Sequence, residues 1–190
     1  RITKQRFHPS AVAAQQITGL PESRVLSSGT VLDTSRLWQL LATRACVSPT
    51  SVHADIVGEH GDTEFALWSH ARIGPVPILD WQPAPSSPNQ DMITPPELDQ
   101  ITTKVRTAAY KVIEGKGATN YAIGVSATRI IEAILNDENA VLPVSIVHRG
   151  HLGIDSVALS IPSIVNATGV ASVLDVPMSV VEQHQLQASA

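Results

Sequence analysis

The sequence predicts an α+β fold for this 190-residue chain, with long helices packed on antiparallel or mixed strands. Apolar residues recur at helical spacing between residues 96 and 115 and again between 119 and 136. Apolar and small residues alternate between residues 154 and 161, as in a half-buried strand. The strand-like segments are grouped and do not alternate with the helices, which favours α+β over a series of βαβ units.

The first half of the chain is predicted to hold two helices and a hairpin. Residues 11–18 favour a helix that stops at Gly19, and residues 24–26 are short and β-like. A second helix is expected up to about Cys46, because residues recur along one side at spacings of three and four: Asp33, Arg36, Leu37, Leu40 and Leu41. Residues 52–57 and 64–68 read as two strands.

The second half is predicted to contain the two longest helices. Leu98, Ile101, Val105, Ala108 and Val112 give the strongest helical period in the chain. Prolines 95 and 96 suit a first helical turn, and a pair of glycines at 115 and 117 ends the pattern. Strands are expected at 141–147 and 154–161, and a final helix within 177–189. Residues 75–95 hold six of the thirteen prolines and are expected to be irregular.

Charge and composition exclude several classes of partner. Thirteen Lys and Arg against seventeen Asp and Glu give a net charge of −4 without a basic cluster, so a nucleic-acid partner is not expected. The apolar runs are too short to span a bilayer. Cys46 is alone and cannot form an intramolecular disulfide, which together with a charged N-terminal segment favours the cytoplasm. The low charged fraction of 16% favours surface hidden against a partner.

Two motifs of familiar appearance do not meet the structural context that they need. Gly115-Lys116-Gly117 imitates a dinucleotide loop, but a helix precedes it where a strand is required, so it is interpreted as a hinge between helices. His148 and His151 have a spacing that could serve a metal on a helix. Gly150 and Gly153 instead predict a loop there, and no metal site is expected.

The remaining candidate constellation is Asp33, Arg36 and His60. Asp33 and Arg36 are three residues apart and can project from one side of a helix. Such a pair is often only a surface ion pair, and His60 between two glycines could be an ordinary turn residue. Spacing alone leaves both interpretations open.

Longer motifs resolve this ambiguity by resemblance. The segment Leu32-Asp33-Thr34-Ser35-Arg36, followed by Gly58-Glu59-His60-Gly61-Asp62, closely resembles the NAD-dependent L-lactate dehydrogenases, especially bacterial ones. The resemblance continues through residues 116–124, 136–139, 143–145 and 161–162, and it covers the chain from about residue 15 onward.

The resemblance implies a role for each site residue. His60 would exchange a proton with the substrate carbonyl oxygen, and Asp33 would orient its ring. Arg36 would bind the substrate carboxylate through two parallel hydrogen bonds. Thr119 matches a threonine beside the substrate, and Ile123 matches a residue against the nicotinamide ring of NAD. We therefore expect the strand to be interrupted in order to present His60 at the mouth of a cleft.

The resemblance also implies how the chain is organised. The Rossmann domain of the family is missing, so residues 1–20 are expected to be a stub from the junction and residues 21–190 the substrate-binding catalytic domain. The expected activity is the interconversion of pyruvate and lactate with NAD or NADH, absent from the isolated chain, and the expected assembly is a homotetramer. Malate dehydrogenase of the same superfamily and a noncatalytic oligomerisation fragment remain alternatives.

A further expectation concerns regulation. Allosteric bacterial members of the family bind fructose 1,6-bisphosphate through an arginine and a histidine at a subunit interface. His53 matches that histidine, but Trp38 stands in the place of the arginine. Loss of a bidentate phosphate ligand predicts weak or absent activation by this sugar phosphate.

Overall fold

A computed structural model describes residues 9–82, 91–117 and 119–190. The helices are α1 (Pro9–Thr18), α2 (Val31–Ala45), α3 (Pro95–Lys116), α4 (Tyr121–Leu135) and α5 (Val180–Ser189), with short 3₁₀ turns at Glu22–Arg24, Pro49–Ser51 and Ile78–Asp80. The strands are β1 (Val52–His53), β2 (Ile56–Val57), β3 (Phe65–Ala66), β4 (Arg72–Ile73), β5 (Val76–Pro77), β6 (Ala140–Leu142), β7 (Ser145–His151), β8 (Ile154–Ser160), β9 (Ser163–Asn166) and β10 (Gly169–Val173). Within these residues, a helix long and apolar enough to cross a membrane is not found.

The strands form four small sheets, and every strand pair in the described part of the chain is antiparallel. The orders are β1-β4-β5, β10-β9-β6, β2-β3 and β7-β8. The α+β prediction is therefore confirmed, with antiparallel and not mixed pairing. Gly58 bridges to Ser160, which ties the start of the β2–β3 loop to the end of β8.

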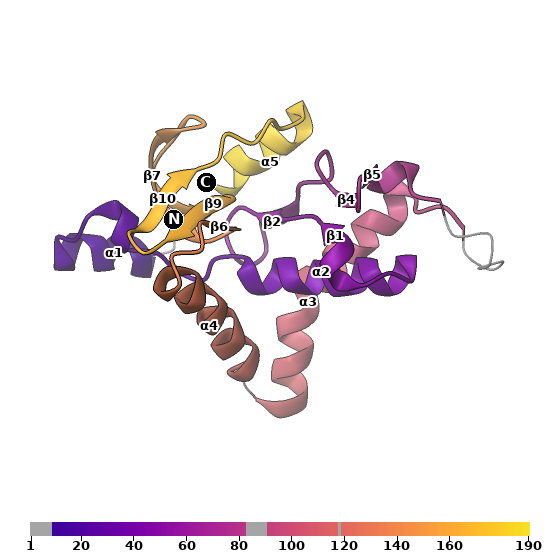
Figure 1. Cartoon of the computed structure of the whole chain (residues 1–190), viewed down its shortest axis with the longest axis horizontal. Coiled ribbons are helices and arrows are strands. Elements are labelled where there is room, and N and C mark those ends of the chain that lie inside the picture. The colour runs from indigo at the N-terminus through magenta and orange to yellow at the C-terminus, as the bar shows by residue number, and fades with distance from the viewer. Residues whose placement is uncertain (1–8, 83–90, 118) are drawn as a thin grey trace, which may run out of the picture.

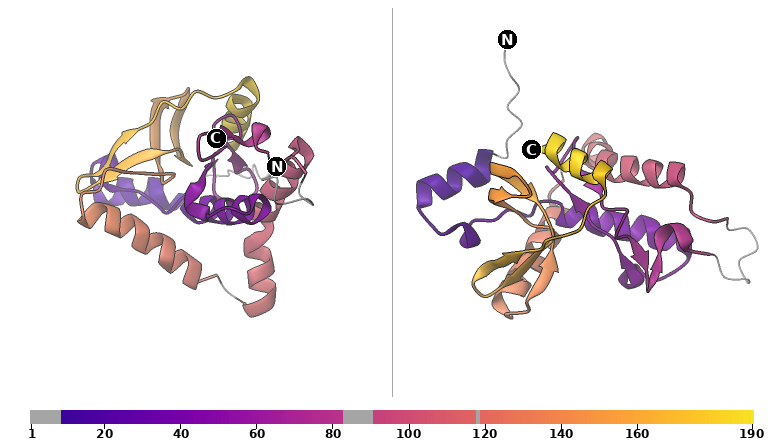
Figure 2. Two further views of the ribbon diagram at one scale, coloured as in Figure 1. Left: turned by 45° about the vertical axis from the view of Figure 1, so that its right-hand side comes forward. Right: turned by 90° about the horizontal axis from the view of Figure 1, so that it is seen from above.

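Helix α2 lies at the centre of the fold (Figure 1). Its apolar side buries Leu37 and Leu41 completely, in a core shared with Ile56 and with Val105 of α3. Its first residue, Val31, belongs to a second core that α4 forms with the β10-β9-β6 sheet. Helices α3 and α4 make a V whose turn projects away from the strands, and this shape persists when the molecule is rotated (Figure 2).

Helix α5 packs over the β2–β3 hairpin and β8, where Leu186 meets Phe65 and Leu159 in a third core. Its start is fixed by a capping box, in which Ser179 and Glu182 each bond the backbone N–H of the other. Glu182 also accepts from the N–H of Ser69 at 3.0 Å, so α5 is fastened to the turn that follows β3.

Most of the predicted elements are confirmed, and three predictions need correction. Residues 24–26 were expected to be β-like, but a 3₁₀ turn covers Glu22–Arg24. Residues 52–57 were expected to form one strand, but they divide between β1 and β2 in different sheets. Residues 141–147 were also expected to form one strand, but they divide between β6 and β7 in different sheets. Pro143 separates the two strands, and its carbonyl accepts the N–H of Thr30 at 3.2 Å. The β9–β10 hairpin was not predicted, and residues 83–90 of the segment expected to be irregular lie outside the described residues.

Candidate active site

The first turn of α2 is fastened to β2 by two threonines. The Thr30 hydroxyl donates to the carbonyl of Ile56 at 2.5 Å, and the Thr34 hydroxyl accepts the N–H of the same residue at 2.9 Å. The N–H of Leu67 donates to the carbonyl of Asp55, which therefore points toward the β2–β3 hairpin partner. Backbone groups of successive residues in a strand point in opposite directions, so those of the next residue, Ile56, face α2. These bonds fix the helix start against the strand that leads to His60.

Asp33 lies on this fixed turn and is buried, with a side chain only 2% exposed. One carboxylate oxygen, Oδ1, accepts from Nη1 of Arg36 at 2.9 Å. A carboxylate is favoured in the first turn of a helix, where backbone N–H groups are unpaired. The interpretation as a mere surface ion pair is therefore wrong for the acid, although Arg36 itself retains 19% exposure.

The loop that carries His60 is held from two sides at its start. The N–H and carbonyl of Gly58 each bond Ser160 of β8 at 2.9 Å, while the N–H of Glu59 donates to the Ser189 hydroxyl of α5 at 2.8 Å. Gly58 has φ of +93°, and a Cβ there would lie 2.7 Å from the Ser189 Oγ. Glycine is thus required at this position for both conformation and space.

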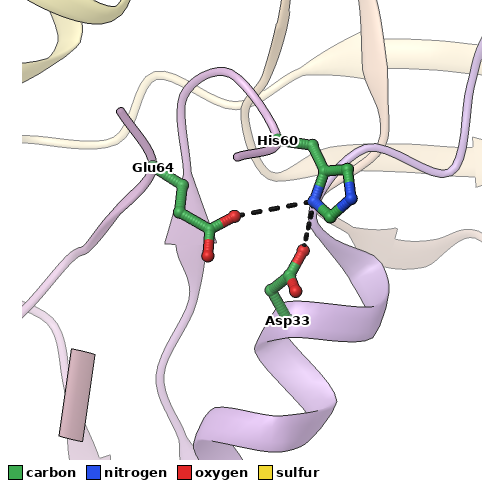
Figure 3. A group of neighbouring side chains, drawn as sticks. All are labelled: Asp33, His60 and Glu64. Atoms are coloured by element: carbon green, nitrogen blue, oxygen red, sulfur yellow. Dashed lines mark ion pairs between the residues drawn. The ribbon is translucent and has the colours of Figure 1, made fainter. Parts of the chain in front are cut away.

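His60 turns one ring nitrogen toward two carboxylates (Figure 3). Its Nδ1 lies 2.6 Å from Asp33 Oδ2 and 3.6 Å from Glu64 Oε2, while the other ring nitrogen points away from both acids. The contact with Asp33, and after it the contact with Glu64, raises the pKa of His60 to about 10 against the opposing effect of burial. The imidazolium is therefore the form favoured at neutral pH.

Glu64 is the second carboxylate of the cluster, and its side chain is 2% exposed. Its Oε2 accepts the N–H of Gly61 at 3.3 Å. Burial raises the pKa of Glu64, and the nearby charge of Asp33 acts in the same direction. The ionisation of Glu64 is consequently linked to that of His60 beside it.

Asp33, His60 and Glu64 could each offer one ligand atom to a metal, and these atoms lie within 4.8 Å of one another. In a tetrahedral zinc site with bonds near 2.1 Å, two ligand atoms stand about 3.4 Å apart. The 2.6 Å separation between His60 Nδ1 and Asp33 Oδ2 is shorter than this, so the two atoms form a direct ion pair that leaves no room for an ion between them. The geometry favours acid–base chemistry over ion binding.

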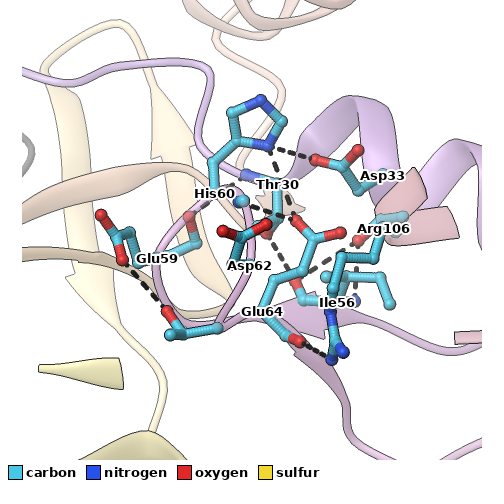
Figure 4. A network of polar contacts seen from close by, with 12 residues as sticks. Thr30, Asp33, Ile56, Glu59, His60, Asp62, Glu64 and Arg106 are labelled. Carbon is cyan, nitrogen blue, oxygen red and sulfur yellow. Dashed lines mark hydrogen bonds and ion pairs between the residues drawn. The ribbon is translucent and has the colours of Figure 1, made fainter. Parts of the chain in front are cut away.

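Helix α3 contacts the second half of the His60 loop, at Asp62 and Glu64 (Figure 4). Nη2 of Arg106 donates to the backbone carbonyl of Glu64 at 2.6 Å, and the Tyr110 hydroxyl donates to Asp62 at 3.2 Å. Arg36 of α2 lines an open groove of about 370 Å³ beside α3, with an apolar wall that includes Leu40, Val105 and Ala108. His60 is not among the residues that line this groove.

The other predicted site residues lie apart from this cluster. Thr119 is half-buried in the turn between α3 and α4, and Ile123 is 40% exposed on α4. Figure 1 places that turn at the lower tip of the molecule, away from the β2–β3 loop. The structure brings Asp33, Arg36 and His60 together and does not bring Thr119 and Ile123 to them.

The two residues considered for effector binding, His53 and Trp38, lie on β1 and α2. His53 is exposed on β1, opposite Arg72 of β4. Trp38 is half-buried against the main core, and its indole N–H donates to the carbonyl of Ala54 at 2.6 Å. Trp38 is thus a packing residue that fixes the backbone next to His53.

The pair His148 and His151, predicted to lie in a loop, is in strand β7. His148 is 2% exposed, its Nε2 lies 3.1 Å from the carbonyl of Leu159, and burial lowers its pKa. The prediction failed because Gly150 is accommodated with positive φ at the end of a hairpin strand. His148 is a core histidine.

Sequence reasoning missed Glu64, Arg106 and Ser189, which hold the His60 loop. The only local signal was for Glu64, an acid four residues after His60 and directly before the buried run that starts at Phe65. The contacts of Arg106 and Ser189 join segments 42 and 130 residues apart. Spacing carries no information on such contacts.

Comparison with known proteins identifies the family of the chain. Residues 30–190 match the family described as lactate/malate dehydrogenase, alpha/beta C-terminal domain. The L-lactate dehydrogenase of Oceanobacillus iheyensis is 45% identical over 177 residues, which are 93% of this chain and 54% of that protein. The L-lactate dehydrogenase of Bifidobacterium animalis subsp. lactis is 46% identical, with 93% and 54% coverage.

Solved structures give the same result. A minor L-lactate dehydrogenase from Enterococcus mundtii in its ligands-bound form superposes with a TM-score of 0.87 at 39% identity, covering 97% of this chain and 57% of that one. MGS-M5, a lactate dehydrogenase from a Medee basin deep-sea metagenome library, gives 0.88 at 38% identity, with 97% and 58% coverage. The chain spans about half the length of the curated relatives it matches. It belongs to the lactate/malate dehydrogenase family and corresponds to the C-terminal portion of the bacterial L-lactate dehydrogenases.

Proposed function

We propose that residues 21–190 are the substrate-binding and proton-transfer domain of a cytoplasmic NAD-dependent L-lactate dehydrogenase, which interconverts pyruvate and (S)-lactate. The observation that carries the proposal is the contact of His60 Nδ1 with Asp33 Oδ2 at 2.6 Å. Arg36, on the same helix as Asp33, bonds the other oxygen of that carboxylate. This arrangement supplies an oriented proton donor and a carboxylate-binding group within one small region, as reduction of a 2-keto acid requires.

His60 would act as the acid. With Nδ1 directed at Asp33, the proton on Nε2 is free to move to the carbonyl oxygen of pyruvate, which becomes the hydroxyl of lactate. Asp33 accepts from Nδ1–H, fixes the ring orientation and stabilises the imidazolium before the transfer. In lactate oxidation the neutral ring takes the proton back at Nε2.

Arg36 would bind the carboxylate of the substrate. One of its nitrogens is bonded to Asp33, which restrains the position of the guanidinium, and its remaining N–H groups can meet a carboxylate with two parallel bonds. The orientation of the carboxylate then also orients the carbonyl next to it. The role of Thr119 beside the substrate rests on the resemblance alone, because the α3–α4 turn that holds it lies away from the His60 loop.

NADH would supply the hydride to the carbonyl carbon when bound. The resemblance assigns Ile123 to the nicotinamide, where an apolar side chain would keep water from the ring, and its 40% exposure leaves the side chain accessible to a ligand. We expect most contacts to the dinucleotide to come from outside residues 1–190, since the chain spans about half of its relatives. The isolated chain should therefore have no turnover, and a homotetramer is the expected assembly of the complete enzyme.

The test is NADH oxidation by the complete polypeptide that contains these 190 residues, with pyruvate and with oxaloacetate as alternative substrates. Pyruvate should be preferred, and His60→Ala should lower kcat by roughly 10²–10⁴-fold, the usual contribution of a general acid. Preference for oxaloacetate would assign the chain to malate dehydrogenase instead. Full activity in His60→Ala, or turnover by the isolated chain, would contradict the proposal.

A further inference from the structure

We propose that Glu64 is a positioning residue for proton transfer, which acts with Asp33 to hold His60 as an imidazolium with its Nε2–H directed outward. The two carboxylates come from different parts of the fold: Asp33 is on α2, and Glu64 directly precedes β3. Both face Nδ1 of His60. The kinetic consequence of this role rests on the proposed function. The structural consequence does not.

The two acids contribute in different ways because Nδ1 carries a single hydrogen. Asp33 Oδ2, at 2.6 Å, takes the direct contact, and Glu64 Oε2, at 3.6 Å, lies too far for a second strong bond. Glu64 therefore acts mainly through its charge when it is ionised: burial raises its pKa, and the contact with His60 opposes that effect. Because its side chain is 2% exposed, solvent screens that charge weakly, and an opposite charge at this distance favours the protonated ring.

Glu64 is held in this position by both its side chain and its backbone. The N–H of Gly61 donates to Oε2 at 3.3 Å, and Gly61 has φ of +135°, a conformation that favours glycine. Arg106 of α3 donates to the backbone carbonyl of Glu64 at 2.6 Å. The carboxylate is thus fixed beside His60 and not merely near it.

The other charged or polar groups around the ring bond groups other than His60, although the buried Nε of Arg106 has no hydrogen-bond partner in the described structure. They are Arg36 on α2, Arg106 and Tyr110 on α3, and Glu59 and Asp62 on the loop itself. Arg36 bonds Asp33, Tyr110 donates to Asp62, and Glu59 accepts from Thr63 at 3.1 Å. Apart from the Gly61 N–H, the partner of the Glu64 side chain in the described structure is His60.

The pairing of His60 with two carboxylates favours one direction of the reaction over the other. Reduction of a keto acid needs the imidazolium, whereas oxidation of a hydroxy acid needs the neutral ring. A second buried carboxylate extends the protonated form to higher pH, so it should widen the pH range of pyruvate reduction and narrow that of lactate oxidation. The raised pKa of His60, to which Glu64 is the second contributor after Asp33, agrees with this direction.

The first test measures the titration of the His60 ring by NMR in the 190-residue chain, with assignment by His60→Gln. Glu64→Gln keeps the size of the side chain and removes its charge, and it should lower the pKa of His60 by about one unit or more. Glu59→Gln is the matched control, because it removes the same charge one residue before His60 without a contact to the ring. It should shift the pKa by less than about 0.3 units.

Glu64→Asp serves as a second variant if Glu64→Gln does not fold. It keeps the charge but withdraws it by one methylene, and the pKa of His60 should fall by a smaller amount. A His60 pKa that is unchanged in a folded Glu64→Gln or Glu64→Asp chain, or lowered equally by Glu59→Gln, would overturn the role of Glu64.

The second test uses the complete polypeptide and the pH profile of kcat/KM for pyruvate. In Glu64→Gln the alkaline limb should move to lower pH by the same amount as the NMR titration, whereas a merely structural role would lower the whole profile without moving it. A lowered His60 pKa in a protein that never reduces pyruvate would remove the proposed function and leave this pairing intact. Pyruvate reduction with an unmoved limb would remove the role of Glu64 alone.

Discussion

Replacement of Thr34 by valine tests how α2 is fixed against the strand that leads to His60. Thr34 is buried, with 1% of its surface exposed. Its hydroxyl accepts a hydrogen bond from the backbone N–H of Ile56 at 2.9 Å. Valine has nearly the same shape but cannot accept, so Thr34→Val leaves that N–H buried without a partner. The carbonyl of Ile56 keeps its bond from Thr30.

The expected loss in free energy of unfolding follows from these contacts. An unpaired buried N–H costs about 1–3 kcal/mol, and the added methyl group recovers part of this. We expect a net loss of about 1–2 kcal/mol, which lowers the Tm by roughly 2–8 °C for a domain of this size.

Urea denaturation of the 190-residue chain, followed by circular dichroism, measures the free energy directly. Thr103→Val on α3 is the control, since Thr103 is exposed and its hydroxyl donates to the carbonyl four residues before it at 2.9 Å, within the same helix. Its effect should stay within about 0.5 kcal/mol. Equal losses in the two variants would refute the reasoning that the Thr34 contact carries the stabilisation.

Three further outcomes are expected. Arg36→Lys in the complete enzyme should raise KM for pyruvate roughly 10–100-fold with a smaller effect on kcat, because lysine loses the two parallel bonds; an unchanged KM would exclude Arg36 as the carboxylate ligand. The pKa of His60 rises from 6.5 to about 10 on folding, so its contribution to stability is complete below the unfolded value and disappears as pH rises through about 10. The stability difference between wild type and His60→Gln should shrink accordingly in urea titrations, and a difference that grows with pH would contradict this sign. Fructose 1,6-bisphosphate should change activity by less than about tenfold because Trp38 cannot form the two phosphate bonds of an arginine, and Trp38→Arg should increase that response; a larger response in the wild type would reject the idea.

The helices could be predicted because their apolar positions are periodic. Leu98, Ile101 and Val105 recur at spacings of three and four, and all three are buried in α3. The Asp33 and Arg36 pair could be placed on one helical face for the same reason. His60 was added by the resemblance of its motif, since local spacing alone left it as a possible turn residue.

The contacts that complete the cluster could not be predicted because they depend on the direction of single side chains. The sequence shows an acid at position 64, but only the hairpin geometry turns it inward beside His60. Pro143 interrupts a run that reads as one strand, because its carbonyl is used by the start of α2. Short strands of two residues, such as β2, have no periodicity from which their ends could be derived.

The His60 loop is attached to β8, α5, α3 and α2, elements that the chain supplies from both of its halves. No local segment can therefore assemble this arrangement before the rest of the domain is in place. A destabilising substitution at a remote core position should lower the fraction of molecules with an assembled site, while each folded molecule keeps its kcat. The number of active sites found by titration and the specific activity of the preparation should then decline in parallel.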